Sequence, residues 1–134
     1  VAPRTDKTEL IVGQQFRYPY SEVVLGLPAG KLEKGAEPFD AGKRELTEET
    51  GCSAEKYTFL GKLYPSPGYC GETIHIYLAE NLSYGEQNPD DDEFLDLIKI
   101  PLDKAEKMVM DNEIFDSKTQ VAVLKISNIM RDRK

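Results

Sequence analysis

The sequence has little of what several common kinds of site require. It contains one histidine, His75, and two cysteines, Cys52 and Cys70, among 134 residues. Two cysteines provide neither a disulfide framework nor the four ligands of a structural zinc site. A single histidine excludes a histidine-rich metal site, and a Ser-His-acid triad would need partners brought in from distant positions. Cysteine and histidine side chains therefore do not suggest a functional site in this sequence.

Positive charge and long apolar runs are scarce as well. The 17 Lys and Arg residues are outnumbered by 24 Asp and Glu residues, which gives a formal net charge of -7. Attraction to nucleic-acid backbones and anionic membranes comes mainly from clustered Lys and Arg, so we expect neither as a partner. The sequence shows no signal peptide and no apolar run of membrane length, which favours a cytoplasmic protein. An acidic protein can still bind a diphosphate where metal ions bridge the two.

The length and composition fit a single domain that spans residues 1–134. An apolar content of 40% is enough for one sizeable core, and no internal repeat is visible. Val1 to Asp6 shows no periodicity, so we expect a ragged terminus there. Runs of β-forming residues predict strands at 9–17, 22–27, 57–64 and 73–79, and another strand that ends at Ile100.

Two helices are predicted in the last third of the chain. The first begins at Pro101 and ends at about Met110. The second is capped by Asp116 or Ser117, because short polar side chains at that position bond the exposed N–H groups of a first turn. Its apolar face includes Val121, Leu124, Ile129 and Met130. Both helices are expected to cover the core.

The clearest local pattern lies between Gly30 and Cys52. Pro38 suits the first helical position, where its missing N–H costs nothing, and Gly51 suits the left-handed residue that closes a helix. A helix of about three turns is therefore predicted between them. Its core-facing stripe contains Phe39, Gly42, Leu46 and Thr50.

Three glutamates stand together on this helix. Glu45, Glu48 and Glu49 have the spacing i, i+3 and i+4, so their carboxylates emerge on one face and repel one another. One interpretation is a solvated acidic face with Arg44 and Lys43 as local partners. The other is a site for Mg²⁺ or Mn²⁺, because these hard cations take carboxylate oxygens and keep waters or phosphate oxygens as further ligands.

The stretch as a whole resembles the Nudix box of the Nudix hydrolases. That pattern is G-x5-E-x7-R-E-U-x-E-E-x-G-U, where U is apolar, and residues 44–52 match it with Gly30 at the expected distance upstream. The first Glu of the pattern falls on Ala36. The run Leu27-Pro28-Ala29-Gly30-Lys31-Leu32-Glu33 and Pro67, sixteen residues beyond Gly51, are similar to the ADP-ribose pyrophosphatase branch. The resemblance covers residues 23–100.

The resemblance implies a fold and a reaction. The fold is α/β, a layered α/β/α sandwich with a mixed, partly curled sheet. The reaction is metal-dependent hydrolysis of a nucleoside diphosphate linked to another group, with ADP-ribose giving AMP and ribose 5-phosphate. Mg²⁺, with Mn²⁺ as the alternative, is held by Glu45, Glu48, Glu49 and the main-chain carbonyl of Ala29. Arg44 orients the helix acids by side-chain pairing.

The same resemblance places a general base in the acidic run 88–93. Taken alone, such a run indicates a solvated loop. Glu93 matches the family position best, since it directly precedes the apolar Phe94 and Leu95. Asp91 is the alternative base.

Three further positions are candidate substrate or metal contacts by resemblance. Arg17 corresponds to a diphosphate or ribose contact, and a surface arginine at a strand end is the equal alternative. The loop 66–71, with Gly68, approaches the ribose or the terminal phosphate. Glu72 beside it reaches the metals, or else is an exposed acid at the end of a strand.

Four positions depart from the branch pattern. Gly26 and Ala36 replace carboxylates, which leaves Arg44 without its usual partner unless Glu37 substitutes, and Gly42 and Gly71 replace other residues. The family's N-terminal strands are expected to be absent from this chain, and the resemblance implies a homodimer. Two alternatives therefore stay open. One is a Nudix hydrolase for another nucleotide sugar or dinucleotide, and the other is a catalytically weakened module that binds a nucleotide.

Overall fold

The computed structural model describes five stretches of the chain, residues 1–17, 22–28, 37–64, 73–85 and 96–133. They contain six strands and three helices, and their order is β1 (Ala2–Pro3), β2 (Glu9–Arg17), β3 (Glu22–Gly26), α1 (Pro38–Thr50), β4 (Cys52–Leu63), β5 (Ile74–Tyr84), β6 (Asp96–Pro101), α2 (Leu102–Met110) and α3 (Ser117–Asp132). The predicted helices 38–50 and 101–110 and the predicted strands 9–17 and 22–27 are confirmed to within a residue. None of the described helices is long and apolar enough to cross a lipid bilayer.

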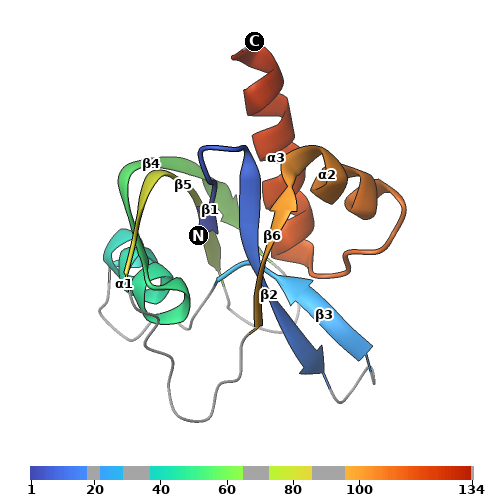
Figure 1. Cartoon of the computed structure of the whole chain (residues 1–134), viewed down its shortest axis with the longest axis horizontal. Helices are drawn as coiled ribbons and strands as arrows, with labels where there is room; N and C mark the ends of the chain where they lie inside the picture. The colour runs from blue at the N-terminus through green and yellow to red at the C-terminus, as the bar shows by residue number, and fades with distance from the viewer. Residues whose placement is uncertain (18–21, 29–36, 65–72, 86–95, 134) are drawn as a thin grey trace.

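The strands form two three-stranded sheets (Figure 1). One has the order β1-β5-β4, in which β1 runs parallel to β5 and β4 runs antiparallel to it. The other has the order β3-β2-β6 and is antiparallel throughout. In Figure 1, α1 lies beside β4 and β5, whereas α2 and α3 lie on the side of β6. The chain therefore has the mixed α/β architecture that the sequence predicts.

Strand β2 shows why this is a layered fold. Leu10 and Val12 are buried in the larger core, which α2 and α3 cover, whereas Ile11 between them is buried in a smaller core with Leu46 of α1. Successive side chains of a strand point to opposite faces. The strand thus has apolar packing on both faces, with helices on each side, and the α/β/α arrangement is confirmed.

The expectation of a ragged terminus was wrong. Ala2 and Pro3 pair in parallel with Leu78 and Ala79 of β5, and Ala2 is fully buried. The N–H of Arg4 donates to the carbonyl of Ala79 at 2.9 Å. A strand of two residues is too short to show a period, and its partner lies far away in the sequence, so local pattern could not reveal it.

The hairpin of β4 and β5 is longer than predicted. Strand β4 begins at Cys52 rather than at residue 57, and β5 continues to Tyr84 rather than ending at residue 79. The burial along β4 does not alternate strictly, since Glu55 and Lys56 are both exposed, and the register shifts between Phe59 and Gly61, where Gly61 has φ 138°. A bulge of this kind breaks the two-residue period on which a strand is recognised.

The predicted apolar face of α3 is confirmed in part. Leu124 is 40% exposed, whereas the buried apolar residues of the helix are Ala122, Val123 and Ile126. Val121, Ile129 and Met130 pack partly against this core. Of the two predicted caps of α3, Asp116 is the one observed, and its carboxylate accepts the N–H of Thr119 at 3.1 Å.

A buried carboxylate joins three distant segments. Glu80 on β5 is 3% exposed and accepts hydrogen bonds from Arg133 after α3, at 2.7 and 3.0 Å, and from Nε of Arg4 at 3.1 Å. The hydrogen bonds from Arg133 and Arg4 lower the pKa of Glu80 to about 2, although burial opposes them. The charge of Glu80 is therefore compensated from both ends of the described chain.

We expect Glu80→Gln to lower the free energy of unfolding by about 3 kcal/mol at pH 7, because two guanidinium groups lose their counter-charge in a buried place. Since the pKa of Glu80 is depressed on folding, its contribution is present above about pH 4.5 and is lost as the pH falls toward 2. Urea unfolding of both proteins should therefore show a smaller difference at pH 3 than at pH 7. The control is Glu55→Gln on the exposed surface of β4. Equal stability of the two variants at pH 7 would contradict the prediction.

Candidate functional site

Helix α1 begins and ends where the sequence predicts. Pro38 occupies the first turn, and the side chain of Glu37 accepts the N–H of Asp40 at 3.0 Å as an N-cap. Gly51 ends the helix with φ 73°, and its N–H donates to the carbonyl of Thr47 at 2.9 Å. The carboxylate of Glu37 thus caps the helix, whereas the ion-pair partners of Arg44 are Glu45 and Glu48, so Glu37 does not take the place of the missing box acid here.

One face of α1 is packed against the β4–β5 hairpin. Leu46 is fully buried and Thr50 is 8% exposed. The ring of Phe39 meets Tyr57 edge-on with the centroids 5.2 Å apart, and it lies 5.4 Å from the ring of Tyr77. Aromatic pairs in this geometry contribute roughly 1 kcal/mol each beyond the area that they bury. The predicted core-facing residues of α1 are therefore the ones through which the helix packs against β4 and β5.

Gly42 is explained by a close approach on the same face. A Cβ at this position would lie 3.1 Å from Cγ2 of Val1 and 3.8 Å from Cδ2 of Tyr77. A glycine within a helix costs about 1 kcal/mol relative to alanine. Here it makes room for Val1, whose nitrogen donates to the carbonyl of Pro28 at 3.1 Å. Val1 thus joins the middle of α1 to the residue that precedes Ala29.

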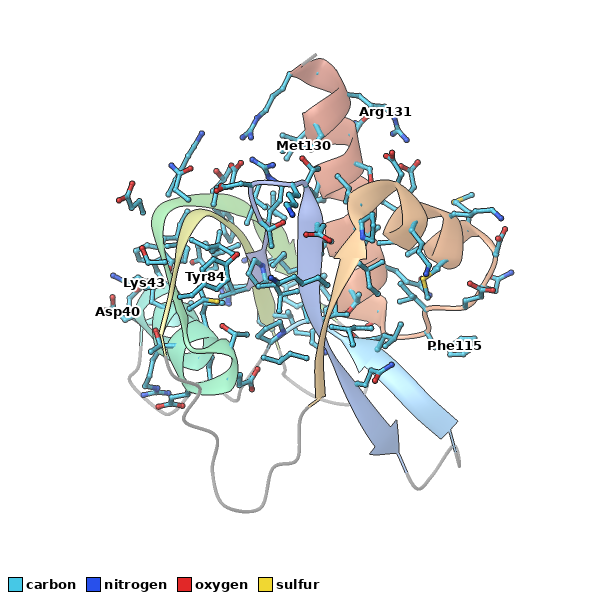
Figure 2. All side chains as sticks on the ribbon, in the orientation of Figure 1. Asp40, Lys43, Tyr84, Phe115, Met130 and Arg131 are labelled. Carbon is cyan, nitrogen blue, oxygen red and sulfur yellow. The ribbon has the colours of Figure 1, made fainter. Side chains whose placement is uncertain are left out.

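Arg44 lies among the acids of the helix. Its guanidinium is 3.8 Å from an oxygen of Glu45 and 3.8 Å from an oxygen of Glu48. These distances are too long for hydrogen bonds, so the pairing is one of charge alone. At the preceding position, the amino group of Lys43 lies 4.6 Å from the ring centroid of Phe39 and 3.9 Å from a carboxylate oxygen of Asp40. Figure 2 shows Asp40 and Lys43 at the outer edge of α1. The basic residues thus offset part of the repulsion between the carboxylates.

The donor set fits a hard divalent cation by its chemistry. Glu45 has an 18% exposed side chain and Glu48 a 48% exposed one, and Glu49 is half-buried. Among the described residues, no three His, Cys, Asp or Glu side chains form a ready-made metal cluster. Mg²⁺ and Mn²⁺ bind through a few carboxylates and retain several waters or substrate oxygens, so a complete protein cage is not needed. The helix can therefore supply part of a coordination shell.

The remaining predicted site residues have different outcomes. Arg17 is the last residue of β2, and its backbone pairs with Glu22 of β3. Several other candidates lie outside the described residues, and their roles stay predictions: Ala29, Gly68, Glu72, Asp91 and Glu93.

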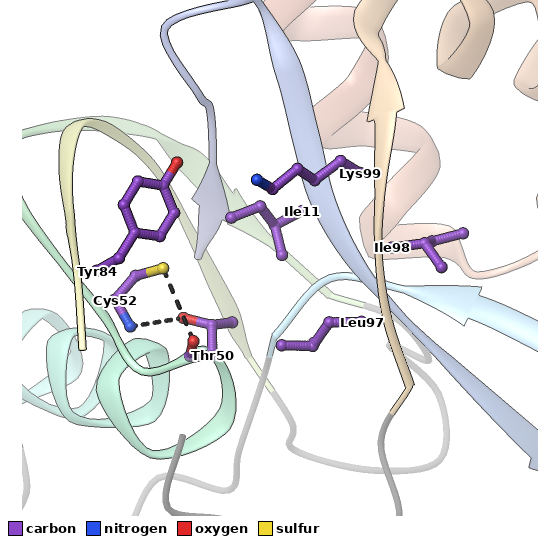
Figure 3. A pocket seen from close by; sticks show the side chains of 7 residues that line it. All are labelled: Ile11, Thr50, Cys52, Tyr84, Leu97, Ile98 and Lys99. Carbon is purple, nitrogen blue, oxygen red and sulfur yellow. Dashed lines mark hydrogen bonds between the residues drawn. The ribbon is translucent and has the colours of Figure 1, made fainter. Parts of the chain in front are cut away.

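A pocket of about 140 Å³ lies where the two sheets meet (Figure 3). The amino group of Lys99 lies 5.4 Å from the ring centroid of Tyr84, and Cys52 is a buried free thiol in the wall. A site for a whole nucleotide ligand usually exceeds about 300 Å³, so this pocket admits at most one ring. No local pattern predicts this pocket, because its walls come from four separate stretches of the chain: Ile11, Thr50, Cys52, Tyr84, Leu97, Ile98 and Lys99.

The end of α1 is held by hydroxyl groups that the sequence interpretation missed. The hydroxyl of Thr50 donates to the carbonyl of Leu46 at 2.6 Å and accepts the N–H of Cys52 at 3.1 Å. The hydroxyl of Thr47 donates to the carbonyl of Cys52 at 3.1 Å. The sequence feature that could have predicted these bonds is a threonine close to the end of a helix, because its hydroxyl can bond nearby main-chain groups.

Known proteins resemble this chain in sequence and in fold. The family model described as NUDIX domain matches residues 1–119. The ADP-ribose pyrophosphatase of Bacillus subtilis (strain 168) is 43% identical over 121 residues, and the methanol dehydrogenase activator of Bacillus methanolicus is 41% identical over 121 residues. Each alignment covers 89% of this chain and 65% of the relative, so the chain spans less than two thirds of their length.

A solved structure gives the same result for the fold. The crystal structure of an ADP compounds hydrolase superposes with a TM-score of 0.84 at 23% sequence identity, covering 98% of this chain and 72% of that chain. At this identity the match establishes the architecture and no more.

Proposed function

The chain belongs to the NUDIX domain family, and from this premise we propose that it hydrolyses a nucleoside diphosphate linked to a second group, with ADP-ribose giving AMP and ribose 5-phosphate. The observation that carries the proposal is the set of three glutamates on one face of a helix whose ends and opposite face are fixed. The similarity to a relative named ADP-ribose pyrophosphatase supports the choice of substrate.

The residues of α1 have distinct roles in this mechanism. Glu45, Glu48 and Glu49, with the carbonyl of Ala29, would hold Mg²⁺, with Mn²⁺ as the alternative. When bound, such an ion neutralises phosphoryl charge and activates water for attack. Arg44 lies 3.8 Å from the two nearest acids and keeps their side chains on the same face.

The chemical step is a displacement at phosphorus. The oxygen of water forms a bond to one phosphorus atom as the bond from that atom to the bridging oxygen breaks. Glu93 takes the proton of the attacking water, and Asp91 is the alternative base. A carboxylate can do this from about 2.6–3.2 Å, directly or through one water. Arg17, Gly68 and Glu72 are the proposed contacts to the diphosphate, the ribose and the metal region.

The proposed setting follows from the same resemblance. We propose that the protein works in the cytoplasm as a homodimer and does not bind nucleic acid. The excess of acidic residues supports the last point, because contacts to a phosphate backbone need clustered Lys and Arg.

Two alternatives are kept because specific observations favour them. A relative of 41% identity is named for activating a dehydrogenase, so similarity of this order does not fix the substrate, and hydrolysis of another nucleotide sugar or dinucleotide is the second candidate. Gly26 and Ala36 replace carboxylates of the branch pattern, which favours a weakened nucleotide-binding module. The complete set of helix glutamates opposes that reading.

A substrate panel tests the proposal. We expect ADP-ribose to be hydrolysed faster than GDP-mannose or ATP in Mg²⁺, with AMP as a product resolved by anion-exchange chromatography, and turnover to stop in EDTA. A preference for ATP would place the chain in another branch of the family. Binding of ADP-ribose without turnover, measured by calorimetry, would favour the weakened module.

Glu49→Gln should reduce kcat for ADP-ribose roughly 100-fold or more, because it removes one charge from the metal ligands and keeps the size of the side chain. The Mg²⁺ concentration for half-maximal rate should rise, and the thermal unfolding midpoint should change little. Glu55→Gln, on the exposed surface of β4, is the matched control and should keep the parent rate. If Glu49→Gln retains the parent kcat at saturating Mg²⁺, α1 is not the metal site.

Glu93→Gln should lower kcat about 100-fold to 10,000-fold with little change in KM, since a general base acts in the transition state. Asp91→Asn is the comparison, and both variants are measured for kcat, KM and Mg²⁺ dependence. A loss of rate in Asp91→Asn alone would move the base two residues upstream. If neither variant loses rate, Glu72 becomes the next candidate.

A further inference from the structure

The pocket in Figure 3 lies between the two sheets, and the strands of each sheet supply one of its walls. Ile11 of β2 and Lys99 of β6 stand directly opposite each other in the register, so their side chains lie on the same face. Cys52 and Tyr84 stand opposite each other in the same way at the end of the β4–β5 ladder. The pocket is therefore bounded by regular strands, which fix the direction of its side chains.

The inner part of the pocket is apolar. Ile11 is 4% exposed and belongs with Cys52 to the smaller core, against which Leu97 is partly packed. The hydroxyl of Thr50 already donates to the carbonyl of Leu46 and accepts the N–H of Cys52. A buried water needs about two to four polar partners, and the described walls do not offer them. The inner part is therefore suited to an apolar group.

The outer part of the pocket carries a cation and a hydroxyl group. Lys99 and Tyr84 are exposed, and in Figure 3 the amino group and the phenol oxygen lie on the same side of the pocket. Within the described part of the chain, Lys99 forms no ion pair and its amino group lies over the Tyr84 ring. The contact of an exposed cation with an aromatic ring is weak. A carboxylate can therefore compete for Lys99, because charge-assisted hydrogen bonds are stronger.

The volume of about 140 Å³ sets the size of the ligand. A cavity of roughly 150 Å³ lined by apolar side chains holds one benzene molecule. One six-membered ring therefore fits the pocket, whereas a whole nucleotide does not.

We propose that this pocket binds a small ring compound that carries one carboxylate. The ring lies against Ile11, Cys52 and Leu97, and the carboxylate accepts hydrogen bonds from Lys99 and from the hydroxyl of Tyr84. The site differs in chemistry from the glutamates of α1, since it offers a cation where the proposed metal site offers carboxylates. The inference does not depend on the proposed hydrolysis.

The test is a titration of the ¹⁵N-labelled protein with benzoate at pH 7, followed by NMR. The solution contains EDTA and no ADP-ribose, so no metal ion can hold the anion. We expect a dissociation constant on the order of 1 mM, which is usual for a ligand of about nine non-hydrogen atoms. The amide shifts should centre on the residues that line the pocket.

Two further probes separate the ring from the charge. Benzamide has nearly the same shape without the charge, and it should bind about 5-fold more weakly than benzoate or worse. Acetate has the charge without the ring, and it should cause no saturable shifts at the pocket.

Lys99→Met keeps the apolar part of the side chain and removes the charge. We expect its affinity for benzoate to fall about 5-fold or more, to that for benzamide, while its affinity for benzamide stays within about 2-fold of the parent value. Residue 99 is exposed, so the variant should fold as the parent does. Lys104→Met is the matched control, since it removes an exposed lysine of α2 and should change neither affinity.

A second variant tests the inner part of the pocket. Leu97→Phe adds bulk to a half-buried wall residue and should abolish the binding of both benzoate and benzamide. If Leu97→Phe does not fold, the comparison of the two probes in Lys99→Met remains decisive.

Several outcomes would overturn the proposal. One is the absence of saturable shifts up to roughly 20 mM benzoate, as when another part of the chain fills the pocket or pairs with Lys99. Shifts centred elsewhere on the protein are another. Equal affinity of the parent for benzoate and benzamide, or parent-like benzoate affinity in Lys99→Met, would also overturn it. None of these results bears on hydrolysis, because neither substrate nor metal is present.

Discussion

Helix α1 carries three carboxylates of like charge within two turns, and the rest of the site depends on how their repulsion is contained. Such a spacing destabilises an isolated helix. In this fold the cost is offset at three places: a cap and a glycine stop at the ends, the fully buried Leu46 on the opposite face, and Arg44 beside the acids. The acids can remain close together because every other part of the helix is fixed.

The layered architecture explains why this helix can be held so closely. Strand β2 has apolar residues on both faces, so the sheets support α1 on one side while α2 and α3 cover the other. The short strand β1 adds a second constraint, because Val1 lies between Gly42 of the helix and the carbonyl of Pro28. Glycine at position 42 costs helix stability, but it allows Val1 to contact α1 and to bond the carbonyl of Pro28 at the same time.

How far the sequence could predict this structure depends on whether a feature is local. Pro38 and Gly51 act on their own backbone, so the ends of α1 were predictable, and the glutamate spacing predicted that Glu45, Glu48 and Glu49 share one face of the helix. The pairing of Ala2 with Leu78 was missed because it depends on residues far apart in the chain. The register shift near Gly61 depends on the pairing of β4 with β5, and the exposure of Leu124 depends on how α3 packs, and neither can be read from a local pattern.

Two sets of glutamates in this chain are paired with arginine in different ways. Glu80 is 3% exposed, is bonded by two arginines from distant segments, and has a pKa of about 2, so its charge is fully committed to the fold. Glu45 and Glu48 face Arg44 at 3.8 Å, beyond hydrogen-bond distance. Arg44 therefore offsets the repulsion between the neighbouring acids of α1 by charge, whereas Arg4 and Arg133 bind Glu80 through hydrogen bonds.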